Sequence, residues 1–254
     1  MRRYIHDSLV VFRRSMVISL QNPVWVLVSL MQPILYLALF GPLLQAVAKT
    51  PGFPPGDAWQ VFVPGLLVQL GIFGAAFVGF GIIAEWRSGV IDRMMVTPAS
   101  RTALITGRVL RDVVIICLQG IILIAAAFLF GLRIPLAAIF GALIVVALLG
   151  AAFAYLSYAA GLALKSEDAL APLLNSIALP ILLLSGILLP MTLAPRWLRI
   201  LSDLDPFKYI VDAERAIFRS EYWSQTTEIG VAIAIVIVLL SAWLGNLVFR
   251  QQTK

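Results

Sequence analysis

The 254-residue chain is poor in the side chains that most enzymes use for chemistry. It holds 1 Cys and 1 His, and 13% of its residues are charged, whereas soluble domains carry about 25%. A single Cys excludes a disulfide framework, a cysteine zinc site and an iron–sulfur site within one chain. A single His, His6, removes most remaining metal and acid–base sites. We therefore predict no catalytic residue and no metal site, and we exclude a disordered chain and an ordinary soluble enzyme.

Hydrophobic residues make up 61% of the chain and gather in six charge-free stretches of at least 20 residues. A bilayer core about 30 Å thick needs about 20 apolar residues at helical rise, and backbone groups in lipid must be hydrogen-bonded within the segment. We therefore predict a single all-α integral membrane domain over 1–254. Its six transmembrane helices are expected at 24–45, 59–84, 104–131, 136–164, 169–189 and 228–249.

The distribution of Lys and Arg predicts which side of the membrane each connection occupies. If the N-terminus is cytoplasmic, that side holds 12 of the 19 basic residues and 6 of the 13 acidic ones. The whole net charge of +6 then lies where anionic headgroups attract it. We expect both termini in the cytoplasm, membrane lipids as partners, and no nucleic acid. Residues 1–22 are expected to form an interfacial amphipathic helix, because Ile5, Leu9, Phe12 and Met16 share one face.

Residues 85–101, between the second and third spans, alternate charged and apolar side chains. A short helical stripe is formed by Val90, Ile91, Met94 and Met95. Pro98 ends it, because proline disfavours helix in the residue before it. A short amphipathic helix in this place is typical of a docking surface for a cytoplasmic partner. It is equally typical of a solvated loop anchored at the membrane interface.

The connection between the fifth and sixth spans is also elaborate. Glycine and proline residues divide it into short pieces, and 196–204 and 207–219 are expected to be two small helices. We predict a short helical external cap over 190–227, marked by Pro190, Trp197, Pro206 and Arg215. Aromatic residues in this segment suit the membrane interface.

These two connections resemble those of the permease subunits of ABC type-2 exporters, the daunorubicin-resistance-type family. The first resembles the family's Glu–basic–x–Gly stretch followed by Thr-Pro and a basic residue, here Glu85, Arg87, Gly89, Thr97, Pro98 and Arg101. The second resembles its Ser-Gly…Pro…Asn-Pro…Arg pattern, here Ser185-Gly186, Pro190, Asp205-Pro206 and Arg215. Asp205 stands where the family commonly has Asn.

The resemblance implies that the chain is half of a membrane domain. A second copy would pair with it, and each copy would bind one of two ABC ATPase subunits through a coupling helix at 85–101. The ATPase-docking residues would be Glu85, Arg87, Gly89, Arg93, Thr97, Pro98 and Arg101. ATP and Mg would lie on the partner subunit, with no cofactor bound by this chain. In agreement, the sequence has no Gly-x-x-x-x-Gly-Lys-Ser/Thr loop for phosphates.

The implied function is the permease of an ATP-driven exporter in a bacterial-type cytoplasmic membrane. Its substrate would be amphiphilic: a drug, a natural product or a lipid. Export of lipid-linked polysaccharide and a role as a non-transporting membrane scaffold or assembly factor are alternatives. An intramembrane enzyme would need a clustered nucleophile, base or metal set, and the sequence offers none.

Polar residues within the charge-free stretches are few, and such groups usually face the helix bundle or a cavity. Candidates for a substrate pathway are Gln32, Tyr36, Gln69, Phe73, Phe77 and Asn175, and interhelical packing is the alternative for each. Because the stretches contain no Asp, Glu, Lys or Arg, a proton- or sodium-driven carrier is disfavoured. Gly71, Ala75 and Gly79 predict a close helix contact, either within one chain or between two.

Overall fold

The computed structural model describes residues 2–21, 24–48, 50, 53–96 and 100–252. These residues form eleven α-helices and one short 3-10 helix, and no strand occurs among them. Six helical segments are long and apolar enough to cross a membrane. The prediction of an all-α membrane protein with six spans is therefore confirmed.

The helix bounds differ in places from the predicted ones. The spanning segments are α2 (Val24–Val47), α3 (Ala58–Ala76) followed by α4 (Gly79–Arg87), α6 (Arg101–Leu129), α7 (Leu136–Leu164), α8 (Glu167–Leu184) and α11 (Gln225–Gln252). The shorter helices are α1 (Arg2–Gln21), α5 (Val90–Met95), η1 (Met191–Leu193), α9 (Arg196–Asp203) and α10 (Pro206–Phe218). α8 ends five residues before the expected 189. There the Ser202 hydroxyl donates to the Leu184 carbonyl at 2.7 Å and caps the helix.

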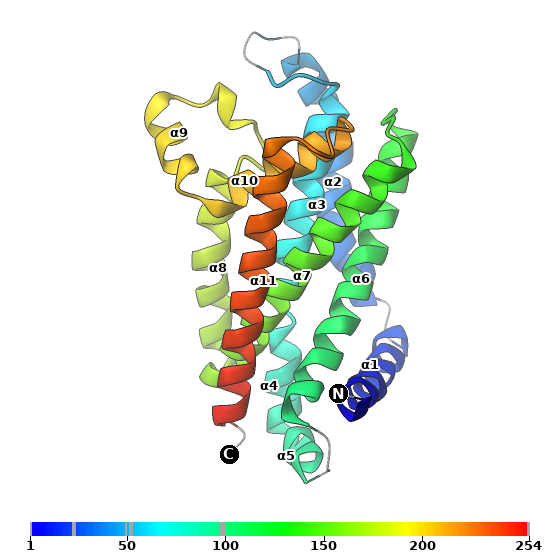
Figure 1. Ribbon diagram of the computed structural model, residues 1–254, viewed down its shortest axis with the longest axis vertical. Coiled ribbons are helices and arrows are strands. Elements are labelled where there is room, and N and C mark those ends of the chain that lie inside the picture. The colour runs from blue at the N-terminus through cyan, green and yellow to red at the C-terminus, as the bar shows by residue number, and fades with distance from the viewer. Residues whose placement is uncertain (1, 22–23, 49, 51–52, 97–99, 253–254) are drawn as a thin grey trace.

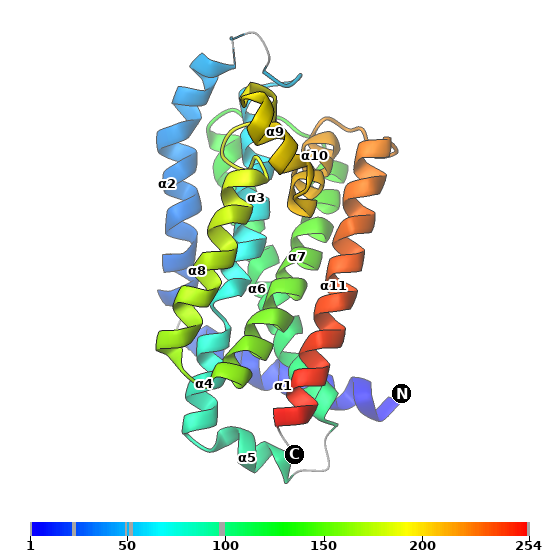
Figure 2. The same ribbon diagram turned by 90° about the vertical axis from the view of Figure 1, so that its left-hand side faces the viewer.

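α7 is the central helix of the bundle and packs against α11, α3, α6 and α4 (Figure 1). Its 29 residues carry no charge, and Leu149, Ala154 and Tyr158 are among its buried side chains. α2, α8 and α11 leave most of their apolar residues exposed, which lipid tolerates because hydrocarbon is itself apolar. Figures 1 and 2 show α1, α5 and the last turns of α11 at one end of the bundle, and α9 and α10 at the other.

The N-terminal helix α1 lies against α6. Ser8 and Val11 are buried, with the Ser8 carbonyl and the Val11 side chain directly against Gly107 of α6. Ile5 and Leu9, which belong to the predicted apolar face, are 52% and 51% exposed. One face of α1 therefore packs on protein, and the predicted apolar face is left outside, where an interfacial helix would meet lipid.

The small-residue stripe on the second span packs within one chain. Gly71 lies against Leu149 and Val146 of α7. Gly79 comes closer still, because a Cβ added there would lie 2.4 Å from the Ser157 carbonyl oxygen of α7. The absence of a side chain at Gly79 lets the two backbones meet, so the intrachain alternative is the one that the structure supports.

The second span, expected as one helix over 59–84, is interrupted between Ala76 and Gly79. The Ser157 side chain bridges the break. Its hydroxyl donates to the Ala76 carbonyl and accepts from the Gly79 amide, the latter at 2.8 Å. A side chain that satisfies backbone groups on both sides of a break is a recognised cause of a bent helix. Ser157 thus fixes the point from which α4 departs.

Candidate functional site

The last part of the second span and the segment that follows it form a bent arm at the end of the bundle. α4 runs to Arg87, and Gly89 then adopts a left-handed conformation with φ of 69°, which glycine reaches without steric cost. α5 follows, and Ser100 caps α6 by accepting from the Ala103 amide at 3.1 Å. We call α4 and α5 the coupling arm. Figure 2 shows it below α7 and α8.

Two ion pairs tie the coupling arm to its neighbours. Glu85 pairs with Arg108 of α6. Arg87 pairs with Glu167, at the start of α8, at 3.1 Å. Glu85 and Arg87 therefore face their own chain, and their charges hold the arm between α6 and α8.

The other predicted docking residues lie differently. Arg93 on α5 and Arg101 at the start of α6 are exposed, and Gly89 is half-buried. Thr97 and Pro98 lie outside the described residues. α5 is itself anchored, because Ile91 is buried and the Met94 sulfur accepts from Arg108 at 3.5 Å. The short helix therefore has an inner side fixed to the bundle and an outer side that carries a cation.

A buried charge cluster lies beside the arm, and sequence reasoning missed it. It consists of Arg108, Arg111 and Asp112 of α6 with Tyr158 of α7. The Tyr158 hydroxyl donates to Asp112 at 2.5 Å, and Arg111 donates to that hydroxyl at 3.2 Å. Arg111 also approaches Asp112 at 3.1 Å and donates to Ser19 of α1 at 2.9 Å. The cluster thus joins α1, α6 and α7, and the Glu85–Arg108 pair joins it to the coupling arm.

The charge cluster lies within the predicted third span. That span was expected at 104–131, although the charge-free stretch in it begins only after Asp112, and the observed helix begins at Arg101. Charged residues therefore lie within the first 12 residues of a spanning helix, and their pairing with one another was not predicted. The signal was present in the spacing, because Arg108, Arg111 and Asp112 lie three and four residues apart and so share one helix face. Asp112 is 3% exposed and Arg108 5%, and such burial requires the pairing that is observed.

The six pathway candidates do not form one site within a single chain. Gln69 is buried and Phe73 half-buried on α3. Gln32 of α2 is exposed and donates weakly to Tyr36 at 3.4 Å. Phe77 is exposed and stacks on Phe80, a residue that sequence reasoning did not single out. The last candidate, Asn175 on α8, is also exposed.

The opposite end of the bundle holds η1, α9 and α10, which belong to the segment predicted to be an external cap and which we call the cap (Figure 1). Arg215 of α10 is 4% exposed and donates to two backbone carbonyls, to Val61 at 3.0 Å and to Gly186 at 2.7 Å. Burial lowers the pKa of Arg215 to about 10, so the guanidinium stays charged at neutral pH. It joins α10 to α3 and to the turn after α8. This residue was predicted to mark the cap, and its bonds give it a structural role there.

The remaining cap residues divide between buried and exposed positions. Pro206 is the first residue of α10, and Asp205 caps the helix by accepting from the Phe207 amide at 3.0 Å. Pro190 is buried, whereas Trp197 of α9 is 64% exposed. An exposed tryptophan on a short amphipathic helix is typical of the membrane interface.

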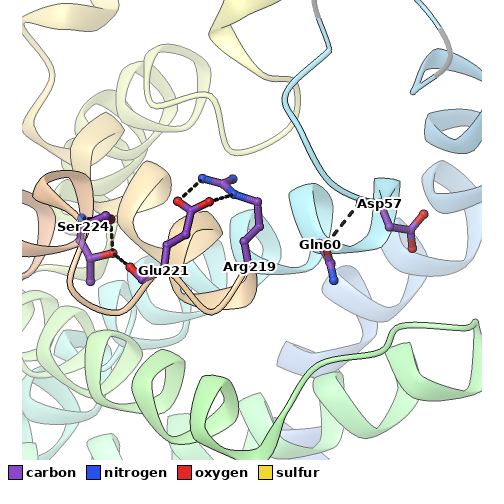
Figure 3. Close-up of polar contacts among 6 residues, drawn as sticks. Asp57, Gln60, Arg219, Glu221 and Ser224 are labelled. Carbon is purple, nitrogen blue, oxygen red and sulfur yellow. Dashed lines mark hydrogen bonds and ion pairs between the residues drawn. The ribbon is translucent and has the colours of Figure 1, made fainter.

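Polar contacts close the turns around α10 and the start of α3 (Figure 3). Arg219 donates two hydrogen bonds to the two carboxylate oxygens of Glu221, each at 3.0 Å. These bonds lower the pKa of Glu221. The Asp57 amide donates to Gln60 at 3.4 Å, which completes a capping box at the start of α3.

One acid in the cap is neither exposed nor paired. Glu214 of α10 has no exposed surface, and neither of its carboxylate oxygens has a hydrogen-bond partner among the described residues. Burial raises the pKa of Glu214 well above its usual range. Burial therefore disfavours the charged form of this acid in the folded protein. Nothing in the sequence pattern predicted a buried carboxyl at this position.

Comparison with known proteins identifies the family. The model of one protein family, described as ABC-2 type transporter, matches residues 7–218. The chain belongs to the ABC-2 type transporter family. The matched region runs from Asp7 within α1 to the end of α10, and it includes the coupling arm and the predicted cap as far as Phe218. The resemblance noted from the sequence is confirmed.

Relatives of this ABC-2 protein carry the name transport permease ycf38. The one from Cyanophora paradoxa is 24% identical over 264 residues, which cover 99% of this chain and 90% of the relative. Those from Pyropia yezoensis and Porphyra purpurea are each 26% identical and cover 81% and 82% of this chain and 72% of their own. The chain is therefore a multi-pass membrane permease of an ABC transporter, and its family implies an ABC ATPase as partner.

Proposed function

We propose that this permease exports amphiphilic drugs, natural products or lipids across a bacterial-type cytoplasmic membrane. Two copies of the chain and two ATPase subunits would form the transporter, and the ATPases would bind ATP and Mg. The supporting observation is the coupling arm, which is tied on one side to α6 through Glu85–Arg108 and on the other to α8 through Arg87–Glu167. A force on α5 would reach two spanning helices through these pairs.

The outer side of α5 is the proposed docking surface for the ATPase. Arg93 is exposed, and Val96 just after the helix is 87% exposed. Arg101, at the next helix start, adds a second exposed cation. A protein partner would cover this apolar and basic surface. Coupling also needs contacts that differ between two states of the partner. The coupling arm would transmit such a difference to α6 and α8 through its two ion pairs.

The predicted orientation follows from the same arrangement. If the ATPases are cytoplasmic, the coupling arm lies inside, and α1 and the last turns of α11 lie at that end of the bundle (Figure 1). Both termini would then be cytoplasmic, and α9 and α10 would form the external cap. The charge distribution of the sequence supports the same direction.

Two of the pathway candidates support a second copy. Gln32 of α2 and Asn175 of α8 are exposed in a single chain, and polar side chains within a span rarely face lipid. A paired copy would cover them, and they would then lie near the space between the copies. The apolar residues around them fit an amphiphilic substrate better than a strongly charged one.

The test is reconstitution of the permease with its ATPase in vesicles. We expect ATP-dependent movement of a lipophilic dye, and we expect Arg93→Ala to lower both dye transport and co-purification of the ATPase. Arg196→Ala is the matched control, because Arg196 is exposed at the other end of the bundle. Normal co-purification without ATP-dependent transport of any amphiphile would favour the scaffold alternative. Unchanged transport in Arg93→Ala would contradict docking through α5.

A further inference from the structure

A groove opens between α1, α6 and α11 at the same end of the bundle as the coupling arm. Its volume is about 590 Å³. Tyr4 of α1, Thr102 of α6 and Trp243, Leu247 and Arg250 of α11 are among the residues that line it. None of these residues belongs to the coupling arm, to the charge cluster or to the pathway candidates. The groove is therefore a separate feature of the surface.

Hydrogen bonds fix the walls of this groove. The Tyr4 hydroxyl lies 2.8 Å from the Thr106 hydroxyl, which in turn lies 3.2 Å from the Tyr155 hydroxyl of α7. Thr106 also donates to the Thr102 carbonyl at 2.8 Å. On the other side, Gly245 of α11 packs directly on Tyr155. Side chains from α1, α6 and α7 thus hold the groove open beside α11.

An apolar stripe on α11 leads into the groove. Val236, Leu240, Trp243 and Leu247 are 54%, 56%, 63% and 39% exposed. Their spacing of four, three and four residues places them on one face of the helix. The stripe is about 16 Å long at helical rise, which is roughly half of a hydrocarbon core about 30 Å thick. Arg250 follows three residues later on the same face, so the stripe ends in a cation.

We propose that the groove binds one anionic phospholipid, with its phosphate at Arg250 and an acyl chain along the stripe. Arg250 forms no ion pair among the described residues, and no Asp or Glu of the described chain lines the groove. Asp7 on α1 is engaged elsewhere, because it accepts from the Ser100 amide at 3.3 Å. Thr102 and Tyr4 supply hydroxyl groups at the headgroup end.

The continuity of the cation and the apolar stripe favours a phospholipid over a soluble phosphate. A soluble anion would use Arg250 and leave the stripe unused. The walls from α1 and α6 distinguish the groove from the open lipid-facing surface of α11, where a lipid has contacts on one side only. The identity of the leaflet, which would be cytosolic, rests on the proposed function. The binding itself does not.

The test uses the full-length permease reconstituted in bilayer discs of equal phosphatidylglycerol and phosphatidylcholine, extracted in mild detergent and examined by native mass spectrometry. We expect one retained phosphatidylglycerol in preference to phosphatidylcholine. Arg250→Gln should lower this preference about five-fold, the effect of one basic residue near an anionic surface. Arg13→Gln should leave it unchanged, because Arg13 is exposed on α1 outside the groove.

Three results would overturn the proposal: no preference in the wild type, an equal loss in both variants, or displacement of the lipid by millimolar glycerol phosphate. The last result would mean a site for soluble phosphate. Because the readout is bound lipid, it does not depend on transport or on the ATPase. A fully active transporter that retains no lipid would therefore contradict the lipid site and not the proposed function. A lipid retained by an inactive permease would contradict the proposed function and not the lipid site.

Discussion

The close contact of α4 with α7 gives a direct test of how the coupling arm is seated. In Gly79→Ala the new Cβ would lie 2.4 Å from the Ser157 carbonyl oxygen and 2.8 Å from the Ser157 hydroxyl oxygen. Ordinary contacts begin at 3.4 Å, so the two helices must separate by about 1 Å at this point. The obstacle is backbone, which cannot rotate away.

The expected cost has two parts. Overpacking of a well-packed contact costs about 1–3 kcal/mol. Separation of the helices would also weaken the bonds from Ser157 to Ala76 and Gly79, each worth about 0.5–1.5 kcal/mol. Alanine favours the helix over glycine by about 1 kcal/mol, which offsets part of the loss. We expect Gly79→Ala to destabilise the permease by about 2 kcal/mol.

Gly81 supplies the matched control. It lies in the same helix, and a Cβ there would meet nothing within 4 Å. Gly81→Ala changes the unfolded chain in the same way, so the difference between the two variants isolates the contact with α7. Unfolding in detergent, followed by circular dichroism, should show Gly79→Ala melting several degrees below wild type and Gly81→Ala at or above it. Equal melting of the two variants would mean that α4 does not lie on α7 as described.

Three further predictions follow from particular contacts. Ser157→Ala should lower the free energy of unfolding by about 1–3 kcal/mol in the same assay, because it leaves the Ala76 carbonyl and the Gly79 amide without their hydrogen-bond partner. An unchanged free energy would show that Ser157 does not stabilise the break between α3 and α4. Exchanging the charges of Arg87 and Glu167 in one double variant should restore the transport that each single reversal lowers, and failure to restore it would exclude their pairing as the tie to α8. Glu214→Gln should raise the free energy of unfolding relative to wild type at pH 8, because burial disfavours the charged carboxylate and the amide cannot ionise. In the wild type the folded state holds the Glu214 proton more tightly than the unfolded state, so the free energy of unfolding should fall as pH rises above the ordinary glutamate pKa of about 4.3. If the melting temperatures of wild type and variant change with pH to the same extent, this reasoning is wrong.

The parts of the fold that depend on the preference of apolar segments for lipid over water could be predicted from the sequence. Long apolar stretches must be helices in lipid, so six spans and the two elaborate connections between them could be predicted. The break at Ala76–Gly79 could not, because the residue that stabilises it, Ser157, lies 81 positions from Ala76. The buried carboxyl of Glu214 was hidden for a similar reason. α10 is covered by α3, α7 and α11, and no local pattern marks the position.

The charge cluster was missed for a different reason, which bears on how the permease is coupled. The predicted third span, 104–131, already contained Arg108, Arg111 and Asp112, but a count of charge-free stretches does not identify their partners. Glu85 and Tyr158, which lie on other helices, complete the hydrogen bonds of these residues. Buried ion pairs add little to stability, and removal of one partner is costly. In this permease the ion pairs restrict the positions of α4, α6 and α7 relative to one another. A motion of the coupling arm that kept these pairs would have to carry all three helices together, whereas a motion that separated Glu85 from Arg108 would leave a buried cation at the membrane edge. The pairs therefore favour rigid-body transmission. A cysteine cross-link between positions 85 and 108 should accordingly leave ATP-dependent transport intact, and a cross-linked permease that hydrolyses ATP without transport would show that the pair must open.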